Sequence, residues 1–186
     1  NTLTLSGIES VDVTEDTVPL IVGERTNVIG SRKFKKLIAK DEFEKAAELG
    51  RKQARGGAHI IDVCMADPDR EELEDMLKFL PVLTRMTKAP LMIDSTDSNV
   101  IEQSLKLCQG KSVINSINLE DGEERFESVV PIARRYGAAL VVGCIDEDPD
   151  DGMAVTVERK LAIAERSHDL LTRKYGIPEQ DIIFDP

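Results

Sequence analysis

Three side chains able to form directed hydrogen bonds each follow a short, mainly apolar run. They are Asp94, Asn115 and Asp185, and each run has the composition of a buried strand. In parallel α/β sheets, ligands bind outside the carboxyl ends of the strands. The spacing of these three residues therefore predicts one polar binding site at that edge of a sheet.

The residue types at these positions limit the ligand. A carboxylate accepts two hydrogen bonds side by side, and a carboxamide both donates and accepts. Together they suit a flat heterocycle with an aminopyrimidinone edge, such as a pterin. Asp and Asn are also favoured helix N-caps, so each residue has an alternative role at the start of the next helix. Three such positions in one chain favour the site.

Further polar residues near the predicted strand ends are weaker candidates. Asn27 lies in the polar segment 23–30, which is bracketed by glycines and follows the first predicted strand. Glycines there also permit an ordinary tight turn. The remaining candidates have solvated loop positions as their alternative, and they are Ser116, Asn118, Asp62, Cys64, Asp146 and Glu147.

Six predicted strands alternate with five predicted helices. The strands are continuous apolar runs, which is typical of parallel strands covered on both faces. The helices have apolar residues at three-and-four spacing, and most are followed by glycine. In the longest helix, this spacing predicts a buried face of Leu161, Ala164, His168, Leu171 and Tyr175. The predicted strands are residues 19–23, 59–63, 91–94, 112–115, 139–142 and 182–185.

Strict strand–helix order leaves two α/β architectures. One is an open doubly wound sheet, and the other is a (β/α)8 TIM barrel truncated after about six strands, since a full barrel needs about 250 residues. Candidate binding residues at three separate strand ends favour the barrel, because an open sheet concentrates its binding site at the one point where the strand order reverses. We expect residues 1–18 to form a lead-in and 19–186 a barrel domain that is incomplete at its C-terminus. Its unpaired strand edges predict self-association.

The bulk composition describes a soluble globular domain. Of 186 residues, 41% are hydrophobic and 32% charged, which is ordinary for such a domain. The net charge of −11 argues against a nucleic-acid surface, which needs a basic face. No apolar run approaches the ~20 residues of a membrane span, and the first residues lack the pattern of a signal peptide. We therefore expect a cytoplasmic protein.

Cysteine and histidine offer little chemistry in this sequence. Cys64, Cys108 and Cys144 are widely spaced and odd in number, which disfavours a disulfide framework or a zinc site. His59 and His168 lie in apolar patterns and are predicted to be packed structural residues. Nucleophilic catalysis is not indicated, because no nucleophile lies beside a histidine in the pattern.

Several segments, in this order, resemble the folate-binding domain of cobalamin-dependent methionine synthase. The resemblance extends from about Val18 to Pro186, and the combination is specific although each segment alone is not. The segments are Gly23-Glu24-Arg25-Thr26-Asn27, Ile93-Asp94-Ser95, Gln109-Gly110-Lys111, Asn115-Ser116-Ile117, Arg135-Tyr136-Gly137-Ala138-Ala139 and Asp181-Ile182-Ile183-Phe184-Asp185-Pro186.

The resemblance implies a pterin-binding barrel of the dihydropteroate synthase-like type. Such a domain binds 5-methyltetrahydrofolate and presents its N5-methyl group to cob(I)alamin, held on a cobalamin-binding domain of the same polypeptide. Asp94, Asn115 and Asp185 match the pterin-anchoring residues of that family, and Asn27 matches a polar residue of its first βα segment. The zinc site of the family lies in a different barrel, so no metal is expected in this chain.

Three alternatives stay open beside this prediction. They are a dihydropteroate synthase, a corrinoid-protein methyltransferase of the same superfamily, and a non-catalytic folate-binding fragment. One further segment bears on the ligand, because residues 31–36 are basic in an otherwise acidic chain. They would attract an anionic tail, such as the glutamates of a folate, and the alternative is a solvated helix start or surface loop.

Overall fold

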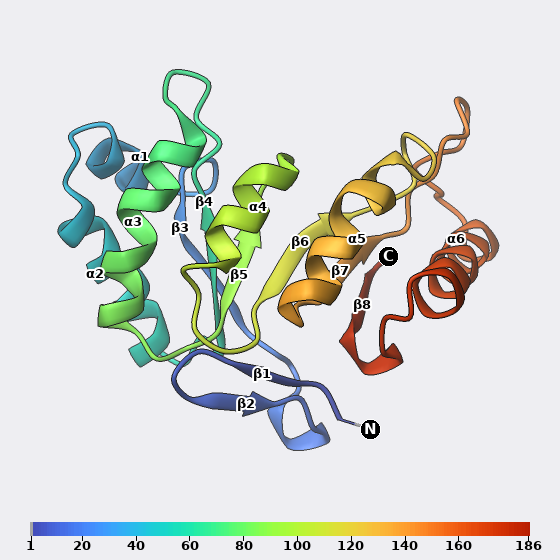
Figure 1. Cartoon of the computed structure of the whole chain (residues 1–186), viewed down its shortest axis with the longest axis horizontal. Coiled ribbons are helices and arrows are strands. Elements are labelled where there is room, and N and C mark those ends of the chain that lie inside the picture. The colour runs from blue at the N-terminus through green and yellow to red at the C-terminus, as the bar shows by residue number, and fades with distance from the viewer. Residues whose placement is uncertain (1) are drawn as a thin grey trace. The chain divides into compact units, whose positions relative to one another are not determined.

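The computed structural model describes residues 2–186, which form two compact units, residues 2–113 and 114–186. From residue 22 on, each strand except the last is followed along the chain by one or two helices (Figure 1). None of the helices in residues 2–186 combines the length and apolar character that a membrane span requires.

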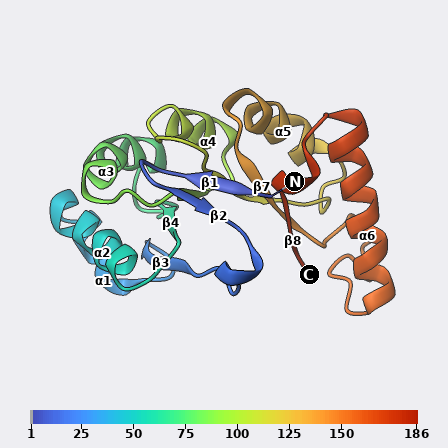
Figure 2. The same cartoon turned by 90° about the horizontal axis from the view of Figure 1, so that it is seen from below.

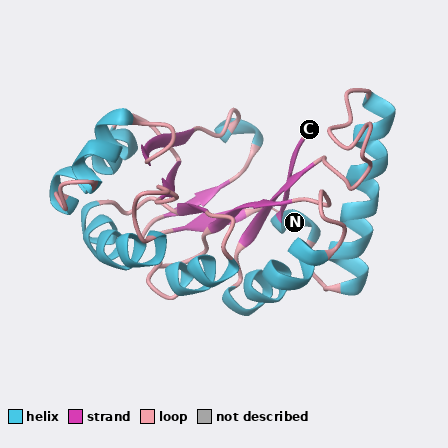
Figure 3. Ribbon diagram, turned by 90° about the horizontal axis from the view of Figure 1, so that it is seen from above, coloured by secondary structure: helices cyan, strands magenta, loops and turns pink. Residues whose placement is uncertain are grey.

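The first unit contains three parallel strands in the order β3-β4-β5. Helices α2, α3 and α4 cover one face of these strands (Figure 3). The strand predicted at residues 91–94 is confirmed as β5. The strand predicted at residues 59–63 corresponds to β4, whose bounds differ by one residue at each end. The elements are β1 (Thr4–Ser6), β2 (Ser10–Asp12), a 3-10 turn (Glu15–Thr17), β3 (Val22–Asn27), α1 (Arg32–Ile38), α2 (Phe43–Arg55), β4 (Ile60–Cys64), α3 (Glu72–Met86), β5 (Leu91–Asp94) and α4 (Ser98–Leu105).

The prediction for the first strand was wrong, because β3 is shifted toward residues that are polar. Residues 23–27 are not a loop but lie within β3, and the pairing with β4 shifts register between Gly23 and Thr26. At this bulge, the backbone N–H of Arg25 donates to Gln53 Oε1 at 2.9 Å. A Cβ on Gly23 would lie 2.6 Å from the same Gln53 oxygen. The absence of a side chain at Gly23 thus lets α2 bind the bulge.

The core of the first unit lies between its helices and the strands they cover. Phe34 of α1 and Phe79 of α3 are both fully buried, and their rings meet edge to face at a centroid distance of 5.2 Å. This geometry is favourable for aromatic pairs. Helix α2 approaches closely at Gly50, where a Cβ would lie 2.7 Å from Leu83. Small residues on α2 therefore set the distance between α2 and α3.

Strands β1 and β2 form an antiparallel hairpin at the end of the unit where β3, β4 and β5 begin (Figures 1 and 2). The hairpin is bound to distant loops, since Ser6 N–H donates to Lys111 O at 3.0 Å and Lys111 N–H donates to Ser6 Oγ at 2.8 Å. Gly110 makes this contact possible: its φ is +70°, and a Cβ there would lie 2.3 Å from Ser6 Oγ.

We predict that Gly110→Ala destabilises the chain. The left-handed backbone and the collision with β1 together cost roughly 2–3 kcal/mol, measured as the free energy of unfolding in urea. Gly122→Ala is the control, because Gly122 has φ +66° but nothing within 4 Å of its position for a Cβ. It should lose only about 1 kcal/mol. Equal losses in the two variants would show that the hairpin contact contributes nothing.

The second unit contains strands in the order β6-β7-β8, with β7 and β8 parallel. The strand at residues 182–185 is confirmed. Gly137, with φ +68°, ends α5 as predicted from its position after the apolar pattern. The elements are β6 (Val113–Ile117), α5 (Glu124–Tyr136), β7 (Ala139–Gly143), α6 (Val157–Asp169), a π-helical turn (Leu170–Lys174), a 3-10 turn (Glu179–Asp181) and β8 (Ile182–Asp185).

The predicted face of the last helix was only partly right, because Leu171 is buried as predicted but the other four predicted residues are not fully buried. The buried residues are Ile163, Ser167 and Leu171, spaced four apart through the π-helical turn, whereas Leu161 is 57% exposed. The small Ser167 lies on the buried stripe, so the stripe was not visible as an apolar pattern. His168 is accordingly not packed: it is partly exposed, with Nε2 3.3 Å from Glu179 Oε1.

Candidate functional site

The side-chain amide of Asn27 joins two carboxylates at the carboxyl ends of β3, β4 and β5. Its Nδ2 group donates to Asp62 Oδ2 at 2.9 Å and to Asp94 Oδ2 at 3.3 Å. Asn27 and Asp62 are buried, with 8% and 2% exposure, while Asp94 is half-buried. Three neighbouring strands thus deliver one polar cluster at the edge where α/β proteins bind ligands.

The oxygen of the same amide organises the loop after β3. Asn27 Oδ1 accepts the backbone N–H groups of Ile29 at 2.8 Å and Gly30 at 2.9 Å. Both Nδ2 hydrogens and both Oδ1 lone pairs are therefore used within the protein. This assigns the amide orientation unambiguously, because a flipped group would place its oxygen against two carboxylates. Asn27 is a positioning residue for Asp62 and Asp94.

Asp94 is the carboxyl of this cluster that remains accessible to a ligand. Burial raises its pKa above the ordinary value, and hydrogen bonds from Asn27 and from the Cys64 thiol act in the opposite direction. The carboxylates of Glu24 and Glu72 raise the pKa further by repulsion. A hydrogen-bond donor or a cation at this point would relieve that repulsion. The environment of Asp94 therefore favours ligands that donate hydrogen bonds.

Glu72 was not identified from the sequence. It is the first residue of α3, after the loop that leaves β4, and its Oε1 atom is buried with no hydrogen-bond partner in residues 2–186. Buried polar atoms nearly always have a partner, so this oxygen is available to a ligand group. A glutamate at the start of the helix that follows a strand-end Asp62-x-Cys64 segment is a signal that could have revealed it, but such residues are common in first helical turns.

Cys64 supports the cluster without being reactive. The thiol is buried, and burial together with the surrounding carboxylates raises its pKa to about 12. A thiol is nucleophilic only as the thiolate, so Cys64 stays protonated and donates to Asp94. Cys64, Cys108 and Cys144 are all free thiols. In residues 2–186, no group of three His, Cys, Asp or Glu side chains is arranged to hold a metal ion.

The other predicted site residues lie in the second unit. Asn115 and Ser116 belong to β6, Asn118 follows it, and Asp185 ends β8. The register pairs Asp185 with Gly143 of β7, and a Cβ built on Gly143 would lie 3.6 Å from that of Asn118. Asn118 and Asp185 therefore lie near the same strand end of β7. Asn118 Oδ1 accepts the Glu120 N–H at 3.0 Å, as in an ordinary turn.

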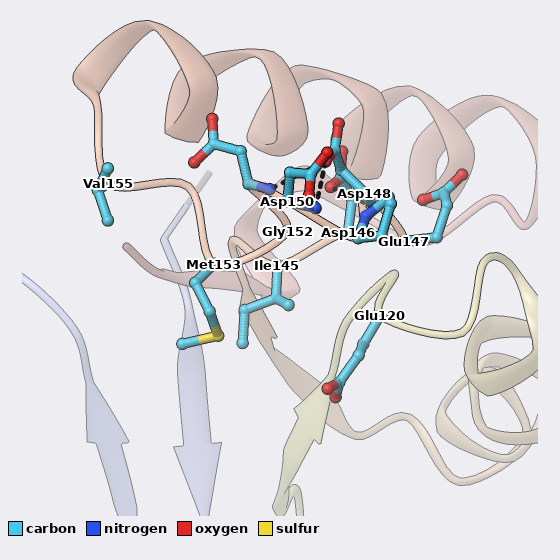
Figure 4. A pocket seen from close by; sticks show the side chains of 11 residues that line it. Glu120, Ile145, Asp146, Glu147, Asp148, Asp150, Gly152, Met153 and Val155 are labelled. Carbon is cyan, nitrogen blue, oxygen red and sulfur yellow. Dashed lines mark hydrogen bonds between the residues drawn. The ribbon is translucent and has the colours of Figure 1, made fainter.

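Two further candidates, Asp146 and Glu147, lie on an acidic loop after β7. The loop lines a hollow of about 440 Å³, shown in Figure 4. Arg159 donates to both carboxylate oxygens of Asp146 at 2.8 and 2.9 Å, and Arg166 donates to Glu147 at 2.9 Å. Asp148 accepts two backbone N–H groups of its own loop. These carboxylates therefore serve the structure of the loop.

The sequence matches the family described as pterin binding enzyme over residues 23–186. The match covers most of the chain, and it begins at the bulge of β3 and includes every candidate site residue named above. The chain belongs to this family.

Solved structures of dihydropteroate synthases share the fold at low sequence identity. The enzyme from Xanthomonas albilineans in complex with 7,8-dihydropteroate is 18% identical, with a TM-score of 0.64 over 94% of this chain and 61% of that chain. The enzyme from Thermus thermophilus is 22% identical, with a TM-score of 0.61 over 99% and 64%. The enzyme from Vibrio fischeri is 14% identical, with a TM-score of 0.68 over 99% and 66%.

These matches confirm the predicted fold class, an α/β fold with six parallel strands of the dihydropteroate synthase-like type. The chain spans less than two thirds of the length of the first two of these synthases. At this level of identity, the likeness concerns the fold.

Proposed function

We propose that this chain binds 5-methyltetrahydrofolate and presents its N5-methyl group for transfer to cob(I)alamin during methionine synthesis. The observation that carries the proposal is the Asn27 amide that holds Asp62 and Asp94 together at the strand ends. The aminopyrimidinone edge of a pterin has two adjacent N–H donors, and a carboxylate accepts such a pair with both oxygens. Membership of the pterin binding enzyme family supports the ligand class.

In this proposal each residue has a stated part. Asp94 accepts hydrogen bonds from the amino and ring N–H groups of the pterin. These donors offset the repulsion between the Asp94 carboxylate and those of Glu24 and Glu72. Asn27 keeps Asp94 in place through its bond to Asp62. The buried Glu72 oxygen, which lacks a partner in residues 2–186, receives a further donor. Asn115 and Asp185 remain predicted contacts, matched to pterin-anchoring residues by the resemblance, and Ser116 and Asn118 remain predicted contacts by their place in or just after the fourth predicted strand.

The chemistry follows from the nature of the leaving group. Methyl transfer breaks the bond between the methyl carbon and N5, which leaves with the electron pair. A tertiary amine leaves poorly unless N5 gains a proton or a hydrogen bond as the bond breaks. The protein's part is to bind the pterin, orient N5 and supply that hydrogen bond, with no covalent enzyme intermediate. Cobalamin, carried on a separate domain of the same polypeptide, supplies the nucleophile that accepts the methyl group.

We predict that calorimetric titration of the chain with 5-methyltetrahydrofolate shows saturable binding of one equivalent. Folic acid has the same pyrimidinone edge but lacks the reduced ring, and serves as the comparison ligand. The reaction is tested by mixing the chain with 5-methyltetrahydrofolate and free cob(I)alamin and following methylcobalamin by its absorbance. Failure of both folates to bind would contradict the pterin site. Binding without methyl transfer would leave a folate-binding module.

Dihydropteroate synthesis is a second candidate, because the solved structures with this fold that we compared are dihydropteroate synthases. That reaction joins a pterin pyrophosphate to p-aminobenzoate, and it uses a pyrophosphate leaving group instead of an amine. Formation of dihydropteroate from these two substrates by the chain, without methyl transfer to cob(I)alamin, would favour this function. The resemblance of residues 23–27 to methionine synthase favours methyl transfer.

A further inference from the structure

A hollow of about 530 Å³ lies at the amino ends of the strands in the first unit, away from Asp94 at the carboxyl end of β5. Three segments line it: the hairpin at residues 9–11, the end of α2 and the residues that lead to β4 at 51–59, and residues 86–90 before β5. Its volume is typical of small-molecule sites. We call it the hairpin hollow, and it shares no residue with the carboxylate cluster described above.

Contacts between the segments hold the walls of the hairpin hollow in place. Glu9 N–H donates to Lys88 O at 3.1 Å, which joins the hairpin to residues 86–90. Gly7 lies so close to the same segment that a Cβ there would be 2.4 Å from both Lys88 O and Ala89 O. The hollow is therefore formed before a ligand enters, which lowers the cost of binding.

His59, which lines the hollow, supplies a hydrogen-bond donor. Its Nδ1 atom accepts the Ile21 N–H at 2.9 Å, so the neutral ring carries its proton on Nε2. Within residues 2–186, no protein group accepts a hydrogen bond from Nε2. The Nε2–H group is therefore available to an acceptor on a ligand.

Positive charge outweighs negative charge around the hollow. The lining contains three cations and one carboxylate, which are Arg51, Arg55, Lys88 and Glu9. Lys88 binds Glu9 at 2.9 Å, and Arg51 binds Glu48 through two hydrogen bonds of 2.6 Å. In the part of the chain from residue 2 to 186, no carboxylate lies within ion-pair distance of Arg55. One guanidinium group therefore remains unused, and its geometry matches that of a carboxylate.

The C-terminus of α2 also lies at this hollow, and helix C-termini carry partial negative charge. Capping reduces that charge here. Gly57 N–H donates to Ala54 O at 3.2 Å, and Ala58 N–H donates to Gln53 O at 3.0 Å. These carbonyl oxygens are engaged, so the net field at the hollow is set by the side-chain cations.

Apolar side chains complete the lining. Val11, Ala54, Met86 and Pro90 come from all three segments. A ligand with an apolar body gains free energy by burying that body against them. Inorganic phosphate has no such body, so the lining favours an organic anion.

We propose that the hairpin hollow binds a small organic anion that has one carboxylate and an apolar body. Arg55 and the Nε2–H group of His59 hold the carboxylate, and the apolar side chains of the lining hold the body. The hollow and Asp94 lie at opposite ends of the strands, so this ligand does not compete with a pterin. It contacts the hairpin, α2 and residues 86–90 together, and it therefore stabilises the folded chain by mass action.

The test uses naphthalene-2-carboxylate and its uncharged analogue naphthalene-2-carboxamide, which have nearly the same shape. Each probe is titrated into the isotope-labelled chain, and the backbone amide resonances are followed by NMR. We expect the carboxylate to shift the amides of residues 9–11, 55–59 and 86–89 saturably, with an affinity about fivefold higher than that of the carboxamide. Arg55→Gln should remove this preference. Lys52→Gln, an exposed change on α2 that does not line the hollow, is the matched control and should keep it.

The amide spectrum also shows whether each variant is folded. Absence of saturable shifts in the three segments, or equal affinity for the two probes, overturns the site. A preference that survives in Arg55→Gln, or is lost equally in Lys52→Gln, overturns it as well. Competition between the carboxylate and 5-methyltetrahydrofolate would contradict a separate site. Loss of preference in Arg55→Gln alone supports the hairpin hollow as an anion site, whether or not the chain binds folate.

Discussion

Asp94→Asn should lower the affinity for 5-methyltetrahydrofolate by a factor of about a hundred. A hydrogen bond to a charged group contributes roughly 1.5–3 kcal/mol, and Asp94 is proposed to make two of them. Asparagine has nearly the same shape and still offers an oxygen to the Asn27 amide, so the cluster is kept. Its NH₂ group, however, faces a donor of the pterin. The measurement is calorimetric titration, and unchanged affinity would contradict the assignment of Asp94.

The same substitution should make the folded chain more stable at neutral pH. Because the pKa of Asp94 is raised in the folded state, the folded chain binds a proton more tightly than the unfolded chain, whose aspartates titrate near about 3.9. The stability associated with the protonated form is fully present below that value and is lost as the pH rises through the raised pKa. Asparagine cannot ionise and avoids this loss.

The gain in unfolding free energy for Asp94→Asn over the unmodified chain should therefore be largest at pH 7 and vanish near pH 3. Urea unfolding at a series of pH values measures it. Asp121→Asn, at an exposed position, removes the same formal charge and corrects for the net-charge effect. A gain that does not depend on pH, or one matched by the control, would argue against a destabilising ionised Asp94.

Asn27→Asp should be the most destabilising single change in the cluster. It replaces the NH₂ group, which lies 2.9 Å from Asp62 and 3.3 Å from Asp94, with a third carboxylate oxygen. An uncompensated buried charge costs about 3–5 kcal/mol, and Asn27 is buried, with 8% exposure. Proton uptake relieves the repulsion, so the loss of unfolding free energy should be smaller at pH 4 than at pH 7.

The matched control for this variant is Asn99→Asp, at a more exposed position on α4. Surface substitutions of this kind usually change the unfolding free energy by less than about 0.5 kcal/mol. A loss in Asn27→Asp that is equal at the two pH values would mean that packing, and not charge, accounts for it. In that case Asn27 would not act by holding the two carboxylates.

Much of the fold was predictable because its elements carry strong local patterns. The runs that became β5 and β8 are short, apolar and ended by an Asp, and the helix that became α5 has its apolar residues Phe126, Val129, Val130 and Ala133 at three-and-four spacing and buries all of them. Helix α1 was not predicted, because only Phe34 and Ile38 are buried in a segment dominated by basic residues. The end of β3 was predicted too early because its buried last residues, Thr26 and Asn27, are polar.

The candidate site was predictable only in its location. Topology alone places Asn27 and Asp94 at the same edge, because parallel strands end together there. The saturation of the Asn27 amide was not predictable, since it depends on four bonds to residues distant in sequence or in a loop. The same holds for Glu72, whose significance comes from the burial of one oxygen atom.

The attachment of the N-terminal hairpin has a consequence for biosynthesis. Lys88, which binds Glu9, lies 79 residues after it, and Lys111, which binds Ser6, lies 105 residues after it, so the hairpin is synthesised long before the residues that hold it in place. Contacts of such long sequence separation slow folding. Until Lys111 emerges, Leu5, which is fully buried in the finished unit, has no complete site to occupy. The nascent chain therefore exposes this apolar residue through most of the synthesis of the first unit, when chaperones have access to it.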